Sequence, residues 1–174
     1  MTAAAPRAAI GVVAGLLGVF VARPFVVGLW PIIALFTVLL VIGVAWPVEP
    51  ERTGRVLVCL LVGVGAFALG RLIGGGHAPA PPTARVIAAS SLAAVAEEAF
   101  FRRLLWSVLR PGGVVLAGLG SAGLFAIAHV TVYGWWVLPL DLAAGLVLAW
   151  QRCASGSWAV PAVTHVVANL LVVI

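Results

Sequence analysis

The sequence contains no lysine and few charges of either sign. Its 174 residues include ten basic residues, all of them arginine, and only five acids. Charged residues make up 9% of the chain and hydrophobic residues 64%, whereas soluble domains carry about 25% charged and about 45–50% apolar residues. This shortage of polar surface excludes a soluble fold, and the length leaves room for one membrane domain and little else.

Cysteine is also scarce, and the positions of the charges and cysteines exclude further classes of protein. Cys59 and Cys153 are far apart and have no CxxC spacing, so we expect neither a disulfide framework nor a zinc knuckle and interpret both as buried, inert thiols. The arginines occur singly or in pairs within apolar sequence although the net charge is +5, so they form no basic face for nucleic acid. No nucleic-acid partner is therefore expected.

Long apolar segments, in contrast, run through the whole chain. A transmembrane helix needs about 20 mostly apolar residues, and seven segments come near that length between breaks rich in proline, glycine or arginine. The sequence therefore predicts an all-α fold, a polytopic transmembrane helix bundle of about seven helices in the lipid bilayer. The expected helices cover residues 8–22, 25–46, 56–73, 85–109, 114–133, 135–150 and 157–174.

Two of these segments need a further argument. The fifth and sixth helices are separated only at Gly134, which aromatic residues flank on both sides as at a membrane interface. The first segment is interpreted as an anchor and not as a signal peptide, because Val21-Ala22-Arg23 is a poor cleavage site and a second apolar helix follows at once. We expect three N-terminal helices in residues 1–83 and a core of four in residues 84–174.

The distribution of arginine predicts the orientation in the membrane. With seven spans, the N-terminus and the even-numbered loops share one side, which carries six arginines against three on the other. Because basic residues favour the cytoplasmic side, we expect a multi-pass protein of the cell (inner or plasma) membrane with a cytoplasmic N-terminus. The first group is Arg7, Arg52, Arg55, Arg103, Arg110 and Arg152, and the second is Arg23, Arg71 and Arg85.

Three charged residues fall deep inside the fourth expected helix. Glu97, Glu98 and Arg102 belong to a segment whose ends lie about a dozen residues from the two glutamates, which is roughly 18 Å at about 1.5 Å per residue. A charged residue near the bilayer centre costs about 2.5–3.5 kcal/mol, so the three together cost about 8–10 kcal/mol before pairing. The whole stability of a domain is about 5–15 kcal/mol, and these residues must therefore face a protein interior.

Helical spacing gives the two glutamates different surroundings. Glu98 and Arg102 are four residues apart, so their charges can pair on one face of the helix. Glu97 is turned about 100° away and has no counter-charge on its own helix. One glutamate is thus held by an arginine, while its neighbour is a candidate general base or acid.

Polar side chains occur in two later helices as well. His129 lies in the fifth expected helix, and His165 and Asn169, again four residues apart, project from one face of the last. Each of these features taken alone has a structural interpretation: a buried ion pair, a packing histidine, or an asparagine that joins two helices. Their combination in one apolar chain favours a functional site.

These residues form three motifs that resemble those of a known family. Residues 97–102, Glu-Glu-Ala-Phe-Phe-Arg, resemble the EExxxR motif of the CPBP (CAAX protease and bacteriocin-processing) family of intramembrane proteases, which includes Rce1-like and Abi proteins. Residues 125–129 resemble its FxxxH motif and residues 165–169 its HxxxN motif, in the same order. The resemblance identifies residues 84–174 as a catalytic core. Arg103 departs from it, because members commonly have glycine there.

The resemblance implies hydrolysis of a peptide bond within or near the bilayer, in a membrane-associated peptide or protein substrate. Glu97 and His129 would activate a water molecule, and Glu98 paired with Arg102 would organise the site. The remaining two, His165 and Asn169, would donate hydrogen bonds to the developing oxyanion.

A metal ion is an open question. The family is often labelled metallopeptidase, and His129 and His165 with a carboxylate would suit a three-ligand Zn²⁺ site with one open position. A metal-free mechanism that depends on glutamate is the alternative within the family, and the spacing of the residues does not decide between them.

Two other functions remain alternatives. Membrane-embedded acids and histidines also line proton pathways, and Asp141, an acid in the sixth expected helix and outside the three motifs, is the main support for a proton-coupled transporter. The structural interpretation of Asp141 is an acid at a helix end near the membrane interface. Against transport, the first half of the chain has no inverted counterpart of the polar sites. The third alternative is an inactive homologue that acts as a scaffold. Glu49, Glu51 and His77 are expected in solvated loops.

Overall fold

The computed structural model describes residues 4–46, 53–74 and 83–173. Within these ranges the regular secondary structure is helical, without a strand, which confirms the expected all-α fold. The loop residues Glu49, Glu51 and His77 lie outside the described residues.

The described chain forms seven helical segments, which correspond one to one with the seven that the sequence predicts. Three of them are composite: the first passes from an α-helix through a π-helical and a 3-10 turn, the fourth contains a π-helical stretch in its middle, and the sixth begins with a 3-10 turn. The elements are α1 (Ala4–Leu17), η1 (Gly18–Ala22), η2 (Arg23–Phe25), α2 (Leu29–Ala45), α3 (Val56–Gly74), α4 (Ala84–Glu98), η3 (Ala99–Leu105), α5 (Trp106–Leu109), η4 (Arg110–Gly112), α6 (Val114–Tyr133), η5 (Trp135–Val137), α7 (Leu138–Ser155) and α8 (Ala159–Val173).

Four of the described segments are long and apolar enough to cross a membrane: Ala8–Phe25, Val56–Gly74, Val114–Tyr133 and Trp135–Ser155. The apolar helices Leu29–Ala45 and Ala159–Leu171 are shorter. The segment from α4 to α5 contains Glu97, Glu98 and Arg102, and these charged residues lower its mean hydropathy. Length and composition therefore place the protein in a membrane, with helices of unequal length around a polar centre.

Glycine sets two of the helix ends. At Gly134 the backbone φ is 89°, a conformation that glycine adopts at no steric cost, and the turn expected there separates α6 from η5 and α7. At Gly156 the φ is 75° and its N–H donates to the carbonyl of Arg152, which ends α7.

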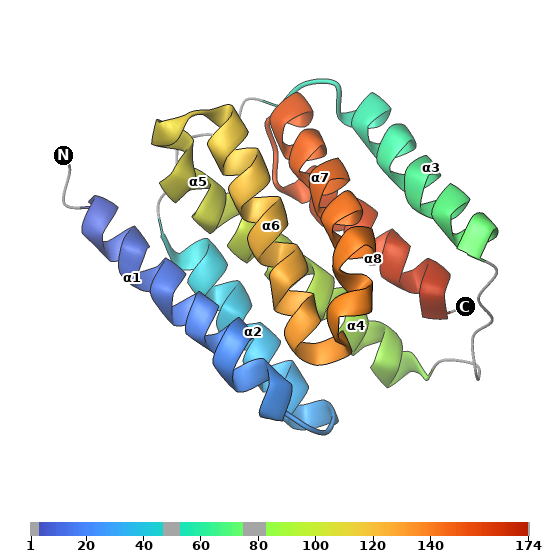
Figure 1. Ribbon diagram of the computed structural model, residues 1–174, viewed down its shortest axis with the longest axis horizontal. Helices are drawn as coiled ribbons and strands as arrows, with labels where there is room; N and C mark the ends of the chain where they lie inside the picture. Colours follow the sequence, from blue (N-terminus) through green and yellow to red (C-terminus); the bar gives the residue numbers. More distant parts are fainter. Residues whose placement is uncertain (1–3, 47–52, 75–82, 174) are drawn as a thin grey trace.

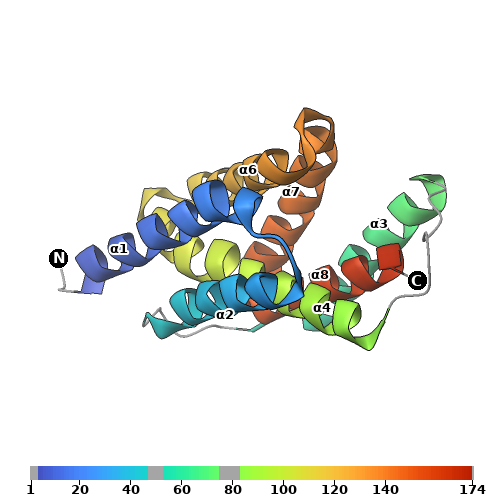
Figure 2. The same ribbon diagram turned by 90° about the horizontal axis from the view of Figure 1, so that it is seen from below.

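The helices lie in two layers, which Figure 2 shows edge-on: α1, α6 and α7 form one layer and α2, α4 and α8 the other, with α3 at the far end. α6 packs along α7, and α4 packs between α2 and α8. The chain crosses from end to end with each segment, so the α1–α2 connection, the start of α4 and the α6–α7 turn share the lower edge in Figure 1. The α5–α6 and α7–α8 turns share the upper edge.

The hydrophobic core surrounds the π-helical stretch η3. Phe100, Phe101 and Leu104 are fully buried there, and Phe36 and Leu39 of α2 pack against them. The expected helix over residues 85–109 is therefore not a regular α-helix: it widens just after the two glutamates. Turns of this kind are frequent at functional sites.

Two sequence-based interpretations are corrected by the fold. Cys59 is buried as expected, but Cys153 is exposed near the end of α7. Arg103, which was counted among the loop arginines, lies within η3, half-buried, and donates from Nη1 to the carbonyl of Gly43 at 2.7 Å. It thereby satisfies a carbonyl in the last turn of α2, which has no partner within that helix.

Candidate active site

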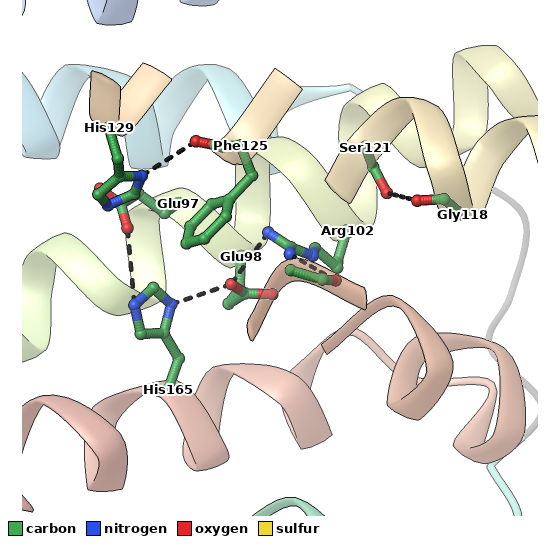
Figure 3. Close-up of polar contacts among 9 residues, drawn as sticks. Glu97, Glu98, Arg102, Gly118, Ser121, Phe125, His129 and His165 are labelled. Carbon is green, nitrogen blue, oxygen red and sulfur yellow. Dashed lines mark hydrogen bonds and ion pairs between the residues drawn. The ribbon is translucent and has the colours of Figure 1, made fainter. Parts of the chain in front are cut away.

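The six predicted site residues come from three helical segments that meet at the centre of the bundle. Glu97 and Glu98 are the last two residues of α4, and Arg102 follows in η3. As Figure 3 shows, the histidine of α6 and the histidine of α8 approach the two glutamates from opposite sides. Tertiary packing thus brings together residues that are up to 72 positions apart, from Glu97 to Asn169.

Glu98 and Arg102 form a fully buried ion pair. The Nη1 atom of Arg102 lies 3.2 Å from Oε1 of Glu98, and both side chains are 0% exposed. The Nη2 atom donates to the carbonyl of Gly145 on α7 at 3.1 Å, and the guanidinium stacks over Phe125 at 4.5 Å. The pairing expected from the four-residue spacing is present, and it is anchored to two further helices.

His165 lies between the two carboxylates. Its Nδ1 atom is 2.9 Å from Oε1 of Glu98, and its Nε2 atom is 3.7 Å from Oε2 of Glu97. Because an ionised carboxylate only accepts, Nδ1 carries the hydrogen and donates it to Glu98. The second distance is longer than a direct hydrogen bond. Glu97 therefore has no partner on its own helix, as expected, but faces an imidazole from α8.

His129 is held in one tautomer by its own helix. Its Nδ1 atom lies 3.0 Å from the carbonyl oxygen of Phe125, which can only accept, so Nδ1 carries the hydrogen. The ring packs against the Phe125 ring at 4.5 Å and stacks on Tyr133 at 6.0 Å. In the neutral imidazole, Nε2 therefore has a free lone pair.

Asn169 joins α8 to α4. Its Nδ2 atom donates to the carbonyl of Ser90 at 3.3 Å, and the side chain is half-buried. An amide nitrogen has two hydrogens, so this bond leaves a second donor.

A cavity of about 540 Å³ collects four of the six residues, within the size range of ligand pockets, about 300–1,000 Å³. Glu97, His129, His165 and Asn169 line it, together with mostly apolar side chains of α1, α2, α4 and α6. Glu98 and Arg102 do not line the cavity; they are buried behind His165. The six residues thus divide into four that can touch a ligand and two that support them.

The structure adds residues that sequence reasoning did not assign to the site. Tyr133 and Arg23 line the cavity. The four-residue spacing of His129 and Tyr133 places both on one face of a helix, so the sequence could have indicated Tyr133. Nothing in the sequence linked Arg23 to α4. Asp141, half-buried in the first turn of α7, does not line the cavity.

The sequence leaves the use of a metal ion open, and the described donor side chains do not form the three-ligand zinc site that it allows. In the described part of the chain, no three His, Cys, Asp or Glu side chains are grouped so as to hold a metal ion. His165 also uses Nδ1 to bond Glu98 and directs Nε2 toward Glu97. The hydrolysis that we propose therefore uses only protein side chains.

Comparison with known protein families identifies the second half of the chain. The family model described as "Type II CAAX prenyl endopeptidase Rce1-like" matches residues 79–171, which is more than half of the chain and includes all six site residues. No curated protein sequence and no solved structure matches the chain. The match indicates a protease, but it supports neither the metalloprotease nor the Abi assignment.

Proposed function

Because the chain belongs to the Rce1-like family of type II CAAX prenyl endopeptidases, we propose that it is an intramembrane endopeptidase that hydrolyses a peptide bond within or near the bilayer. The family and the apolar helices make it a membrane protein of the CAAX protease type. The cavity carries the proposal, because Glu97, His129 and His165 line it from three different helices. A water molecule and the carbonyl group of a membrane-associated peptide can meet all three there.

Glu97 acts as the general base. Its side chain is 14% exposed, so it reaches the cavity while most of it is shielded from solvent. Its carboxylate takes a proton from the water, whose oxygen attacks the carbonyl carbon. The free lone pair of His129 Nε2 accepts a hydrogen bond from the second hydrogen of that water and orients it. When the C–N bond breaks, the proton passes from Glu97 to the leaving nitrogen, so that one water is consumed.

His165 and Asn169 stabilise the oxyanion. In its doubly protonated form, His165 keeps its bond to Glu98 and offers the hydrogen on Nε2, while Asn169 offers its second amide hydrogen beside the bond to Ser90. A preorganised donor of this kind contributes about 3–4 kcal/mol. The Glu98–Arg102 pair fixes the orientation of His165, so it acts by positioning.

Substitution of the water-activating residues tests this function. We expect Glu97→Gln and His129→Ala, in protein reconstituted into lipid vesicles, each to lower kcat for a transmembrane reporter peptide by about 10²–10⁴-fold. Glu51→Gln, which removes an acid from an expected loop, should leave kcat unchanged. Natural substrates should accumulate uncleaved in cells that carry Glu97→Gln. Full proteolysis by both site variants would refute the catalytic assignment, whereas no proteolysis by the unmodified protein would favour a scaffold role.

The described residues add no support for the alternative function as a transporter. Asp141 was its main support, and Asp141 does not line the cavity that Glu97 and the two histidines share. Proton flux in vesicles that is lost in Asp141→Asn but kept in Glu97→Gln would be the result that favours transport.

A further inference from the structure

The imidazole of His129 contacts the side chains one helical turn before and one turn after it. Its Nδ1 atom lies 3.0 Å from the carbonyl oxygen of Phe125, and the two ring centroids are 4.5 Å apart with a tilt of 51°. The ring of Tyr133 lies 6.0 Å from the imidazole and within 17° of parallel to it. Because side chains four residues apart lie one above the other on a helix, His129 lies between Phe125 and Tyr133 along α6.

The two neighbours of His129 differ in their surroundings. Phe125 is 2% exposed and packs in the hydrophobic core, which fixes its position. Tyr133 is 54% exposed and lines the cavity together with His129. It is the last residue of α6, and the chain turns away at Gly134. No later residue of this helix covers the imidazole, so the contact on that side depends on Tyr133.

This contact bears on the chemistry because Nε2 of His129 has to face the water. Rotation of the imidazole about its Cβ–Cγ bond, a broad torsion, would break the hydrogen bond to Phe125 and turn Nε2 away. An offset-stacked ring pair is favoured by up to about tenfold over separated rings. A reacting group misplaced by about 1 Å can lower the rate by about 10²-fold. The stack on Tyr133 therefore opposes a rotation that would be costly for catalysis.

We propose that Tyr133 is a positioning residue of the active site, whose ring stacks on the His129 imidazole and keeps Nε2 directed at the water that Glu97 activates. The proposal rests on the proposed peptidase function and adds a residue that none of the three motifs contains. Tyr133 acts through His129 and transfers no proton, because its ring makes the contact. Trp135 and Trp136 in the next turn are exposed as well, but they do not line the cavity.

The kinetics of three variants test the proposal with a fluorogenic transmembrane peptide in lipid vesicles. Tyr133→Leu keeps an apolar side chain but removes the ring, and we expect kcat to fall about tenfold while KM stays within about twofold. Tyr133→Phe, the conservative variant, restores the ring without the hydroxyl group and should recover most of kcat. Trp135→Leu is the matched control, because it removes an exposed ring from the next turn. It should leave kcat unchanged.

Other kinetic patterns would overturn the proposal. Full activity of Tyr133→Leu would show that His129 needs no support from that ring. An equal loss of kcat in Tyr133→Phe would assign the effect to the hydroxyl group. A rise in KM alone would make Tyr133 a substrate contact. An equal loss in Trp135→Leu would mean that both aromatic residues only anchor this turn at the membrane interface.

Nuclear magnetic resonance of the imidazole separates positioning from the peptidase function. The chain has three histidines, so protein labelled only at the ring nitrogens of histidine gives few signals, and His129→Ala identifies those of His129. Nitrogen chemical shifts report which ring nitrogen carries the hydrogen. We expect hydrogen on Nδ1 in the unmodified protein and in Tyr133→Phe, and a mixture of both tautomers in Tyr133→Leu.

The two measurements together assign a failure to one proposal or the other. If the unmodified protein cleaves nothing while Tyr133→Leu still changes the His129 signals, the peptidase function fails and the stacking contact stands. If peptides are cleaved while Tyr133→Leu leaves both the His129 signals and kcat unchanged, only the positioning role of Tyr133 fails.

Discussion

The buried charge of Glu98 is neutralised from two directions. Arg102 reaches it along the same helical segment at 3.2 Å, and His165 reaches it from α8 at 2.9 Å. Two charges taken out of water lose several kcal/mol of hydration each, and their attraction compensates only while both remain. The pair therefore fixes His165 in place and makes the site sensitive to the loss of either partner.

A prediction at the residue scale follows from this balance. Arg102→Met leaves the buried Glu98 carboxylate with His165 as its one remaining partner among the described residues, and we expect the free energy of unfolding to fall by about 3–5 kcal/mol. Adding Glu98→Gln should restore more than half of that loss, because no unpaired charge then remains. Thermal unfolding in detergent measures both. A double variant as unstable as the sum of the single variants would show that the two side chains act independently.

Glu98, Arg102 and His165 show which contacts of the site the sequence predicts and which it does not. The four-residue spacing predicts the Glu98–Arg102 pair, because helix geometry alone places the two side chains on one face. The contact of Glu98 with His165 spans 67 positions and depends on how α8 packs against α4, which no local pattern contains. The motif resemblance selects six residues that the fold brings together, but the division into four that line the cavity and two that lie behind it comes only from packing.

At the scale of elements, the π-helical stretch η3 departs most from expectation. The apolar and charged pattern over residues 85–109 predicts a regular helix, since a wider turn depends on tertiary packing and not on local propensity. α2 approaches this stretch closely: a Cβ added to Gly43 would lie 2.7 Å from the carbonyl carbon of Ala99. Arg103, the residue that departs from the family pattern, bonds the carbonyl of Gly43 at 2.7 Å. The Arg103 side chain thus ties η3 to the end of α2.

Gly43→Ala tests this helix contact. The added methyl group meets backbone atoms, which cannot turn aside as a flexible side chain can, so we expect a loss of about 1–3 kcal/mol in unfolding free energy. Gly65→Ala on α3 is the matched control, because a Cβ there meets nothing within 4 Å. Detergent unfolding curves compare the two. A control variant that is destabilised as much as Gly43→Ala would mean that glycine matters for helix flexibility and not for close packing.

At the scale of the whole molecule, the helix ends that share one edge of the bundle determine which segments line the cavity. The lower edge in Figure 1 holds the turns near Arg23 and Gly134 and the start of α4. The cavity lining includes Arg23, Val86 and Tyr133, which lie at that edge. The N-terminal segments α1 and α2 form part of the wall, so the expected core of residues 84–174 does not enclose the cavity alone. Sequence patterning predicts the order of helices, but not which of them surround the site.

Orientation in the membrane is the remaining prediction, and it decides from which side a substrate enters. Even with Arg103 placed inside a helix, more arginines belong to the edge of the N-terminus than to the opposite edge, so we propose that the N-terminus is cytoplasmic and that the cavity edge faces outward. In a chain with Cys59→Ala and Cys153→Ser, a cysteine at Val27, which is 83% exposed beside Arg23, should react with a membrane-impermeant maleimide in intact cells. A cysteine at Gly54, exposed at the opposite edge, should react only after permeabilisation. The reverse pattern would place the N-terminus outside and require substrates to reach the cavity from the cytoplasm.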